Sequence, residues 1–252
     1  MSHLQAAVLG VVQGLTEFLP VSSSAHLILV PRLFGWPDQG LAADVALHWG
    51  TMAGLLAYFW KDWWKILKER EQRRFLLWLV LASVPAAVLG LLVKDFVETA
   101  CRGVGPVSVT LVAFGLLLGW ADRVGSRARG WESLDLKTCV LIGLAQALAL
   151  FPGVSRSGVT ITAGLFLGLK REDAARFSFV LAVPVVFGAG ILEFKHLGEI
   201  ALTPPFWTAV IAAALTGFAV IAGFLRYLRS GSLLAFAVYR VLLGLLLLAM
   251  LR

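Results

Sequence analysis

Residues 10–26 read GVVQGLTEFLPVSSSAH, and residues 143–159 read GLAQALALFPGVSRSGV, which is the same pattern 133 positions later. Each copy is an apolar arm that breaks at proline or glycine into a cluster of hydroxyl side chains. Aligned without a gap, the copies place Gln13 on Gln146, Phe18 on Phe151, Val21 on Val154, Ser22 on Ser155 and Ser24 on Ser157. Polar groups at breaks in apolar segments are costly in a membrane and therefore indicate a functional site. Two related copies predict a site at the interface of two repeats.

The composition is that of a helical membrane protein. Of the 252 residues, 59% are hydrophobic and 15% are charged, whereas a soluble domain carries roughly 45–50% and about 25%. Six apolar runs approach the roughly 17–25 residues that a helix needs to cross a bilayer: 41–60, 75–93, 104–120, 177–193, 205–225 and 233–251. We therefore predict an all-α polytopic membrane protein.

The basic residues are concentrated in a few connections. Of the 22 lysines and arginines, 15 lie in four segments: 61–74, 121–137, 170–176 and 226–232. Basic residues collect in cytoplasmic loops, so these four connections are expected in the cytoplasm. This distribution explains the net charge of +7 without a nucleic-acid partner. The tryptophans within and beside the first segment are expected to anchor it at the membrane interface.

One topology places all four connections on the same side. Segments 4–35 and 138–169 each hold two short arms around a break, and each is expected to be a re-entrant hairpin. Arms of about 14 residues rise only roughly 21 Å, short of the ~30 Å apolar core, although the charges alone also fit two full crossings per hairpin. Each hairpin precedes three spans, and an odd number of spans inverts the second half. We thus expect one integral membrane domain over 1–252, built from inverted repeats 4–120 and 138–251.

The two hairpin tips are expected to meet around a polar pocket. Irregular backbone at mid-membrane depth is tolerated only where it is buried in protein or lines a wet cavity. Serines after each break are suited to cap a second short helix, whose N-terminus then directs N–H groups and a positive dipole end into the pocket. Arg156 adds a guanidinium fork that suits phosphate oxygens. The pattern therefore predicts a phosphate site.

The side chains at the tips suit acid–base or nucleophilic phosphoryl chemistry. Gln13 and Glu17 are four apart and share one helical face, and His26 lies within one helical turn of Ser22 and Ser23. The second tip contributes Ser155, Arg156, Ser157 and Thr160. Each of these residues taken alone has a simpler structural explanation. A serine in a membrane helix often bonds back to the preceding turn, and Arg156 can serve simply to neutralise Glu17. These residues alone do not distinguish a phosphatase from a transporter of phosphorylated compounds.

Asp44 and His48 form another pair four residues apart, near the outer end of the run 41–60. We expect them either to be supporting residues around the site, a role also expected of Gln13, or to form a purely structural pair.

The stretches QGLTEFLPVSSSAH and PGVSRSGVT resemble the two signature regions of the undecaprenyl-diphosphate phosphatase family of the bacitracin-resistance type. DVALHWGT at 44–51, FSFVLAVP at 177–184 and FAVYR at 236–240 are also similar to that family, so the likeness covers essentially the whole chain. It implies removal of the terminal phosphate from undecaprenyl diphosphate, which yields the monophosphate lipid carrier used in cell-wall synthesis. The expected location is the bacterial inner (plasma) membrane, with the pocket open to the outer, periplasmic face.

The resemblance also implies roles for residues. The family's motif of Glu or Gln, three residues and then Glu falls on Gln13 and Glu17, where the first position is Gln. A divalent cation, Mg²⁺ or Ca²⁺, is implied, with Glu17 as a ligand and the diphosphate and water supplying most of the rest. The family's serine and histidine of the first tip fall on Ser23 and His26, which are the candidate catalytic residues beside Glu17 and Arg156. The residues expected to bind substrate phosphate, beside Arg156, are Ser22, Ser155, Ser157 and Thr160.

The mechanistic hypothesis combines these roles. Arg156, backbone N–H groups and the cation neutralise the phosphates. Ser23 is the candidate nucleophile, with His26 or Glu17 accepting its proton, and direct attack by water is the alternative. The expected partners are the polyprenyl diphosphate substrate and membrane lipids, and a homodimer is allowed. Inverted repeats with broken helices are also a transporter architecture, so a transporter or flippase of polyprenyl phosphate is the alternative function.

Overall fold

The computed structural model describes residues 1–37, 39–69, 72–197 and 203–251, and apart from one isolated bridge every regular element within these ranges is helical. The α-helices are α1 (His3–Phe18), α2 (Ser23–Leu33), α3 (Gly40–Tyr58), α4 (Trp60–Lys68), α5 (Arg73–Phe96), α6 (Val104–Val124), α7 (Leu136–Gln146), α8 (Arg156–Phe166), α9 (Arg171–Leu197), α10 (Pro204–Leu228) and α11 (Leu234–Met250). Between α5 and α8 lie the short π-helix η1 (Val97–Cys101) and the short 3₁₀ helices η2 (Trp131–Ser133) and η3 (Ala147–Leu150). Arg70 of the basic connection 61–74, and residues 198–202 of the expected second repeat, lie outside the described residues.

The six apolar runs of the sequence lie almost entirely in helices. Among the described residues, four helices are long and apolar enough to cross a membrane: α5 over Arg73–Val93, α6, α9 over Arg171–Ile191, and α10. The segment Leu136–Leu150 and α11 are shorter apolar helices. Large apolar side chains such as Leu92 and Leu215 are exposed on the long helices, as expected for surfaces that face lipid. The prediction of a polytopic helical membrane protein is confirmed at this level.

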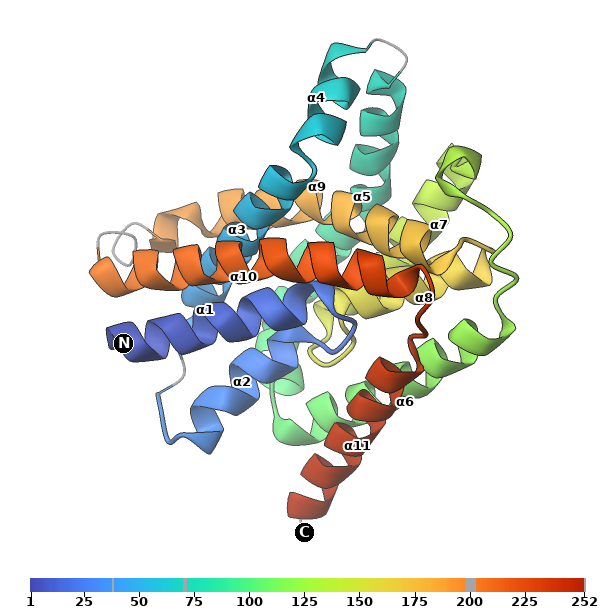
Figure 1. Ribbon diagram of the computed structural model, residues 1–252. Coiled ribbons are helices and arrows are strands. Elements are labelled where there is room, and N and C mark those ends of the chain that lie inside the picture. Colours follow the sequence, from blue (N-terminus) through green and yellow to red (C-terminus); the bar gives the residue numbers. More distant parts are fainter. Residues whose placement is uncertain (38, 70–71, 198–202, 252) are drawn as a thin grey trace.

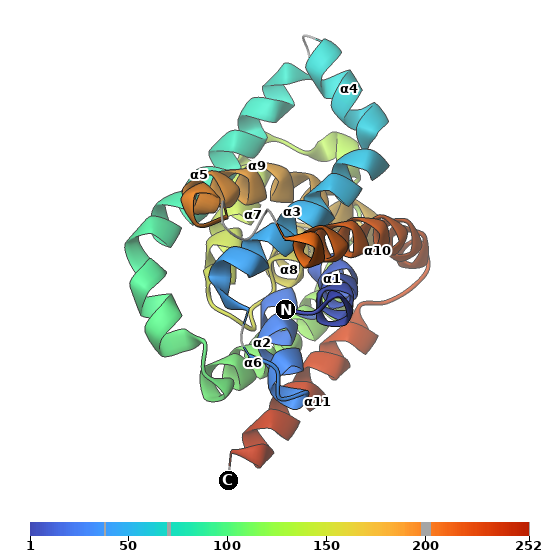
Figure 2. The same cartoon turned by 90° about the vertical axis from the view of Figure 1, so that its left-hand side faces the viewer.

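Helix α10 packs along both α1 and α3 (Figures 1 and 2). Glycines make this approach close, because a Cβ added at Gly14 of α1 would lie 2.5 Å from the Cβ of Thr216. A Cβ at Gly54 of α3 would lie 2.3 Å from the carbonyl oxygen of Ala214. Small residues allow backbones to approach in this way inside membranes. A second tight pair, α6 with α11, lies in the lower part of Figure 1.

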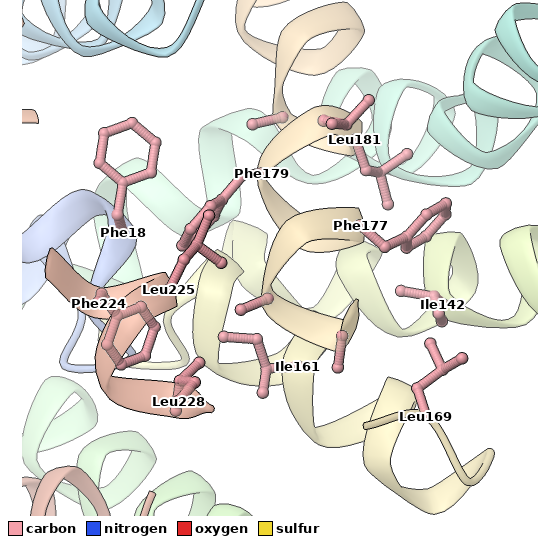
Figure 3. Packing of buried hydrophobic residues seen from close by; sticks show 14 of the residues in the cluster. Phe18, Ile142, Ile161, Leu169, Phe177, Phe179, Leu181, Phe224, Leu225 and Leu228 are labelled. Atoms are coloured by element: carbon pink, nitrogen blue, oxygen red, sulfur yellow. The ribbon is translucent and has the colours of Figure 1, made fainter. Parts of the chain in front are cut away.

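An aromatic cluster anchors the first break to the bundle. Phe18, the last residue of α1, packs edge-on against Phe179 of α9 with ring centroids 5.1 Å apart, and Phe179 lies 6.3 Å from Phe224 of α10. Figure 3 shows these rings within a larger core that extends to Ile161 of α8. Because the break begins immediately after Phe18, this packing fixes the position of the first tip.

The basic segment 61–74, expected as a connection, is largely helical. Helix α4 covers Trp60–Lys68, with Ile66 buried and Trp60 and Trp64 exposed, and α5 begins at Arg73. Alternating aromatic, basic and apolar residues give α4 one apolar face, so it can fold against the bundle as an amphipathic helix. Its tryptophans and lysines are residue types that are enriched at membrane interfaces.

Polar contacts fasten the helix ends on the expected cytoplasmic side. Buried Asp122 at the end of α6 accepts hydrogen bonds from Arg171 at the start of α9 and from Ser232 before α11, at 2.5 and 3.1 Å. Asp135 caps α7 by accepting from the Thr138 N–H at 2.7 Å. The hydrogen bonds from Thr138 hold the pKa of the Asp135 carboxyl below its usual range. The connections are thereby fixed relative to the helices that carry the site.

Candidate active site

The two breaks share an unusual backbone conformation. Ser22 has φ 76° and Ser155 has φ 70°, a region that residues with a Cβ rarely adopt. Each caps the following helix, because Ser22 Oγ accepts from the Ala25 N–H at 3.4 Å and Ser155 Oγ accepts from the Gly158 N–H at 3.1 Å. Helices α2 and α8 therefore both begin at a tip, as the sequence predicted.

Glu17, near the end of α1, lies at the centre of the site, and only 6% of it is exposed. Arg156 of the second tip donates to Glu17 Oε1 at 2.9 Å. Ser23 donates to Oε2 at 2.7 Å, and Gln13 donates to the same oxygen at 3.1 Å. His48 of α3 places its Nε2 atom 3.3 Å from Oε2. One buried carboxylate thus joins both tips and α3.

Both ring nitrogens of His48 face acceptors. Nδ1 lies 2.7 Å from the carbonyl oxygen of Asp44, and Nε2 faces Glu17. A neutral imidazole has one donor, so a ring between two acceptors indicates the imidazolium form. Arg156 and His48 then provide two positive charges against the single negative charge of Glu17. This excess of positive charge suits an anionic ligand.

The second tip is fastened to its surroundings by its polar side chains. Arg156 Nη1 donates to the carbonyl oxygen of Ser178 on α9 at 2.7 Å. Thr160 Oγ1 lies 2.7 Å from Ser178 Oγ, and Ser157 Oγ donates to the Leu19 carbonyl oxygen at 3.1 Å. Ser157 and Thr160 therefore hold the tip against α9 and the first break, which positions Arg156 toward Glu17.

The two ring nitrogens of His26 contact groups other than the Ser23 hydroxyl. Its Nδ1 atom lies 2.7 Å from the carbonyl oxygen of Ser22, and its Nε2 atom lies 2.7 Å from the hydroxyl of Tyr239 on α11. The carbonyl can only accept, so Nδ1 carries a proton, and in the neutral ring Nε2 accepts from the Tyr239 hydroxyl. Because both nitrogens are occupied, Glu17 is the acceptor that the structure places beside the Ser23 hydroxyl.

Asp44 and His48 do not pair through their side chains. The Asp44 carboxylate accepts from Gln39 Nε2 at 2.6 Å and from Arg102 Nη2 at 3.3 Å. His48 contacts only the main chain of Asp44 and turns its ring toward Glu17. Asp44 therefore holds Arg102 near the site, while His48 belongs to the site itself.

Two adjoining cavities lie at the tips. The first, of about 210 Å³, has the polar residues Glu17, Ser23, Ser24, His48, Gln146, Ser155 and Arg156 on its walls. The second, of about 230 Å³, is bordered by Asp44 and Arg102 and shares Ser24, Val45, His48, Ala149 and Leu150 with the first. The remaining walls are mainly apolar side chains of α5, α9 and the second tip. A polar end for an anionic group thus adjoins apolar walls suited to a hydrocarbon chain.

Arg240 of α11 binds both breaks, and the sequence analysis did not select it. The side chain is fully buried, and Nη2 donates to the carbonyl oxygens of Gly153 and Val154 at 2.9 and 2.8 Å. Nη1 lies 3.4 Å from the carbonyl oxygen of Pro20 in the first break. The signal available in the sequence was an arginine within an otherwise apolar helix, which is rare without a function or a partner.

We expect Arg240→Leu to destabilise the protein by about 1–3 kcal/mol for each carbonyl group left without a partner. The measurement is thermal unfolding of the purified protein in detergent. Arg229→Leu is the control, because the exposed Arg229–Glu172 pair should contribute roughly 0.2–1 kcal/mol. Equal unfolding temperatures for the two variants would contradict the role of Arg240 at the breaks.

The first tip offers oxygen atoms of the kind that a divalent cation binds. Glu17 offers a carboxylate, and the amide oxygen of Gln13 beside it has no hydrogen-bond partner within the described residues. Oxygen ligands of these types are preferred by Mg²⁺ and Ca²⁺. No cluster of three or more His, Cys, Asp or Glu side chains suited to a metal ion occurs in the described part of the chain. A cation at this position would therefore depend on phosphate oxygens and water for most of its ligands.

Comparison with known proteins gives consistent matches over the whole chain. The family model of the bacitracin resistance protein BacA matches residues 6–246. The undecaprenyl-diphosphatase of Moorella thermoacetica is 48% identical over 255 residues, which cover 99% of this chain and 98% of that protein. The undecaprenyl-diphosphatases of Pelotomaculum thermopropionicum and Thermomicrobium roseum are each 46% identical, over 97% and 98% of this chain and 95% and 98% of their own lengths.

Proposed function

This chain belongs to the bacitracin resistance protein BacA family, and we propose that it is an integral membrane undecaprenyl-diphosphate phosphatase. It hydrolyses undecaprenyl diphosphate to undecaprenyl phosphate and inorganic phosphate, and so recycles the lipid carrier of cell-wall synthesis. The observation that carries the proposal is the buried Glu17–Arg156 pair, which joins the two tips beside the Ser23 hydroxyl. The names of the relatives favour hydrolysis over transport of polyprenyl phosphate.

In the proposed complex the diphosphate enters the polar end of the cavities and the prenyl chain follows their apolar walls. Arg156 and His48 carry the positive charge that attracts the phosphate oxygens. Such preorganised charge is the main protein contribution to phosphoryl transfer. Arg102, held by Asp44 at the second cavity, adds a further positive charge at the border of the site.

The proposed reaction uses the hydrogen bond between Ser23 and Glu17. Ser23 Oγ attacks the terminal phosphorus, its proton passes to Glu17, and the bond from phosphorus to the bridging oxygen breaks. Undecaprenyl phosphate leaves with the electrons of that bond. A water molecule then attacks the phosphorus of the phosphoserine, and the bond from phosphorus to Ser23 Oγ breaks. Glu17 returns its proton to Oγ, which restores the Ser23 hydroxyl, and inorganic phosphate leaves with the oxygen and protons of the water. The 2.7 Å contact supports Glu17 as the proton acceptor, and direct attack by water at the same phosphorus is the competing route.

A divalent cation is part of the proposal, with Mg²⁺ or Ca²⁺ held by Glu17 and the Gln13 amide oxygen. When bound, such a cation neutralises negative charge on the phosphate oxygens. The orphaned amide oxygen of Gln13 supports this assignment.

The proposal includes two inverted repeats, 4–120 and 138–251. Helices α1, α2, α3, α5 and α6 would correspond in order to α7, α8, α9, α10 and α11. Contacts support this correspondence, because α1 packs on α10 as α7 packs on α5. The corresponding helices α3 and α9 also pack on each other, as do α6 and α11. The matching caps at Ser22 and Ser155 support it further.

The proposed location is the bacterial plasma membrane, with the basic connections in the cytoplasm and the cavities open to the outer face. The position of the second cavity supports this orientation. Its border includes Asp44 near the start of α3 and Arg102 after η1, which lie at the expected outer ends of their helices. An enzyme oriented in this way would act on carrier lipid released outside the cell.

The test of the proposed function is phosphate release from undecaprenyl diphosphate by purified protein in detergent, with and without divalent cations. We expect EDTA to lower the rate by about 10²-fold or more, and added Mg²⁺ or Ca²⁺ to restore it, because the cation offsets phosphate charge in the transition state. The unfolding temperature in EDTA shows whether the protein remains folded. Full activity in EDTA would contradict the cation, whereas folded protein inactive with either cation would contradict the phosphatase.

A further inference from the structure

Gln146 is a buried amide without a protein partner at the cavity. It is the last residue of α7, only 1% exposed, and it lines the 210 Å³ cavity with Ser155 and Arg156. Neither its Nε2 nor its Oε1 atom has a hydrogen-bond partner among the described residues. Buried polar side chains nearly always have a partner. The amide of Gln146 is therefore placed to form a hydrogen bond with a ligand in the cavity.

The sequence repeat shows why this amide is not used inside its own hairpin. Gln13 occupies the matching position of the first hairpin, and its Nε2 atom donates to Glu17, four residues later. Four residues after Gln146 the chain has Leu150, an apolar residue that also lines the cavity. The second hairpin thus keeps the glutamine and lacks the carboxylate that would accept its hydrogen bond.

The other strong donors at the cavity are already engaged. Arg156 donates through Nη1 to Ser178 and through Nη2 to Glu17. Ser23 likewise donates to Glu17. The Nε2 group of Gln146 is left as a buried donor that a ligand can use without breaking a contact within the protein.

We propose that Gln146 binds the substrate directly, with its Nε2–H group donating a hydrogen bond to a non-bridging oxygen of the diphosphate. This inference rests on the proposed phosphatase function and adds a substrate contact to it. The amide keeps its donor at any protonation state of the site, and it brings no positive charge that Glu17 would attract. Gln146 would therefore bind the phosphate and leave the ion pair between Arg156 and Glu17 intact.

The test compares Gln146→Leu and Gln146→Glu in phosphate release from undecaprenyl diphosphate, with thermal unfolding in detergent. A hydrogen bond to a charged group contributes enough for Gln146→Leu to raise KM by about 10- to 100-fold. Gln146→Glu should raise KM further, because it replaces the donor with a negative charge. The unfolding temperature of ligand-free Gln146→Leu should equal or exceed that of wild type, since the change removes an unpaired buried amide.

Ile142→Val is the matched control, one turn earlier on α7 and buried in the core shown in Figure 3. It should lower the unfolding temperature and leave KM unchanged. An active wild type with unaltered KM in Gln146→Leu would overturn this inference and leave the phosphatase intact. An unaltered KM in Gln146→Glu with a lower half-saturating Mg²⁺ concentration would also overturn it, in favour of a cation ligand. A wild type that releases no phosphate would overturn the proposed function instead.

Discussion

Replacing Ser23 with alanine is expected to lower kcat for phosphate release from undecaprenyl diphosphate by about 10³-fold or more, the usual scale for loss of a nucleophile. The Ser23 hydroxyl lies at the cavity and donates to Glu17 at 2.7 Å, so its oxygen is oriented by the group that would take its proton. Arg156 and His48 remain in place in the variant. Binding should therefore persist, and steady-state kinetics should show the loss in kcat with little change in KM.

Ser108→Ala provides the matched control for this substitution. Ser108 is a fully buried serine, whereas Ser23 is partly buried, and the Ser108 hydroxyl donates to the Val104 carbonyl oxygen within α6. Its activity should remain within about twofold of wild type because such back-bonds contribute little to a helix. If Ser23→Ala retains a tenth or more of the wild-type kcat, water attacks the phosphorus directly and the serine only orients Glu17.

The local features of the site were predictable from the sequence. The repeated break with its serines predicted the caps at Ser22 and Ser155, because a hydroxyl after a proline or glycine break satisfies free N–H groups of the next helix. The four-residue spacing of Gln13 and Glu17 predicted their contact on one face of α1. These contacts lie within one or two turns of the chain, where the spacing of residues determines which side chains meet.

The long-range contacts were not predictable in the same way. The spacing of His26 and Ser22 is compatible with their contact, but the second nitrogen of His26 binds Tyr239, which is 213 positions away. The approach of His48 to Glu17 and the contacts of Arg240 with both breaks likewise depend on how separate helices pack. Helical periodicity gives the face of each helix, and it does not give the neighbour that the face meets.

The basic residues of 61–74 did not establish that Trp60–Lys68 is helical, for a related reason. Its lysines and arginines indicated a cytoplasmic connection, and that charge pattern is the same for a loop and for an interfacial helix. The structure places Trp63 against the main core and pairs Asp62 with Arg176 of α9 at 2.8 Å. These tertiary contacts stabilise a nine-residue helix that would be marginal alone.

Glu17→Gln is expected to lower kcat by about 10²–10⁴-fold, the range for loss of a general base. Glutamine has the same shape, but its amide accepts a proton from Ser23 far less readily than a carboxylate does. The change also removes the counter-charge of Arg156 and His48, which should destabilise the ligand-free protein by about 3 kcal/mol or more. Steady-state kinetics and thermal unfolding in detergent measure the two effects.

Added inorganic phosphate separates the catalytic role of Glu17 from a purely structural one. With Arg156 and His48 left uncompensated, phosphate should bind Glu17→Gln more tightly and raise its unfolding temperature more than that of wild type. The control is Glu132→Gln, which neutralises an exposed carboxylate on η2 and should change neither kcat nor the response to phosphate. An active Glu17→Gln enzyme would transfer the base role to another group. If added phosphate does not raise the unfolding temperature of Glu17→Gln, the placement of the anion between Arg156 and His48 is contradicted.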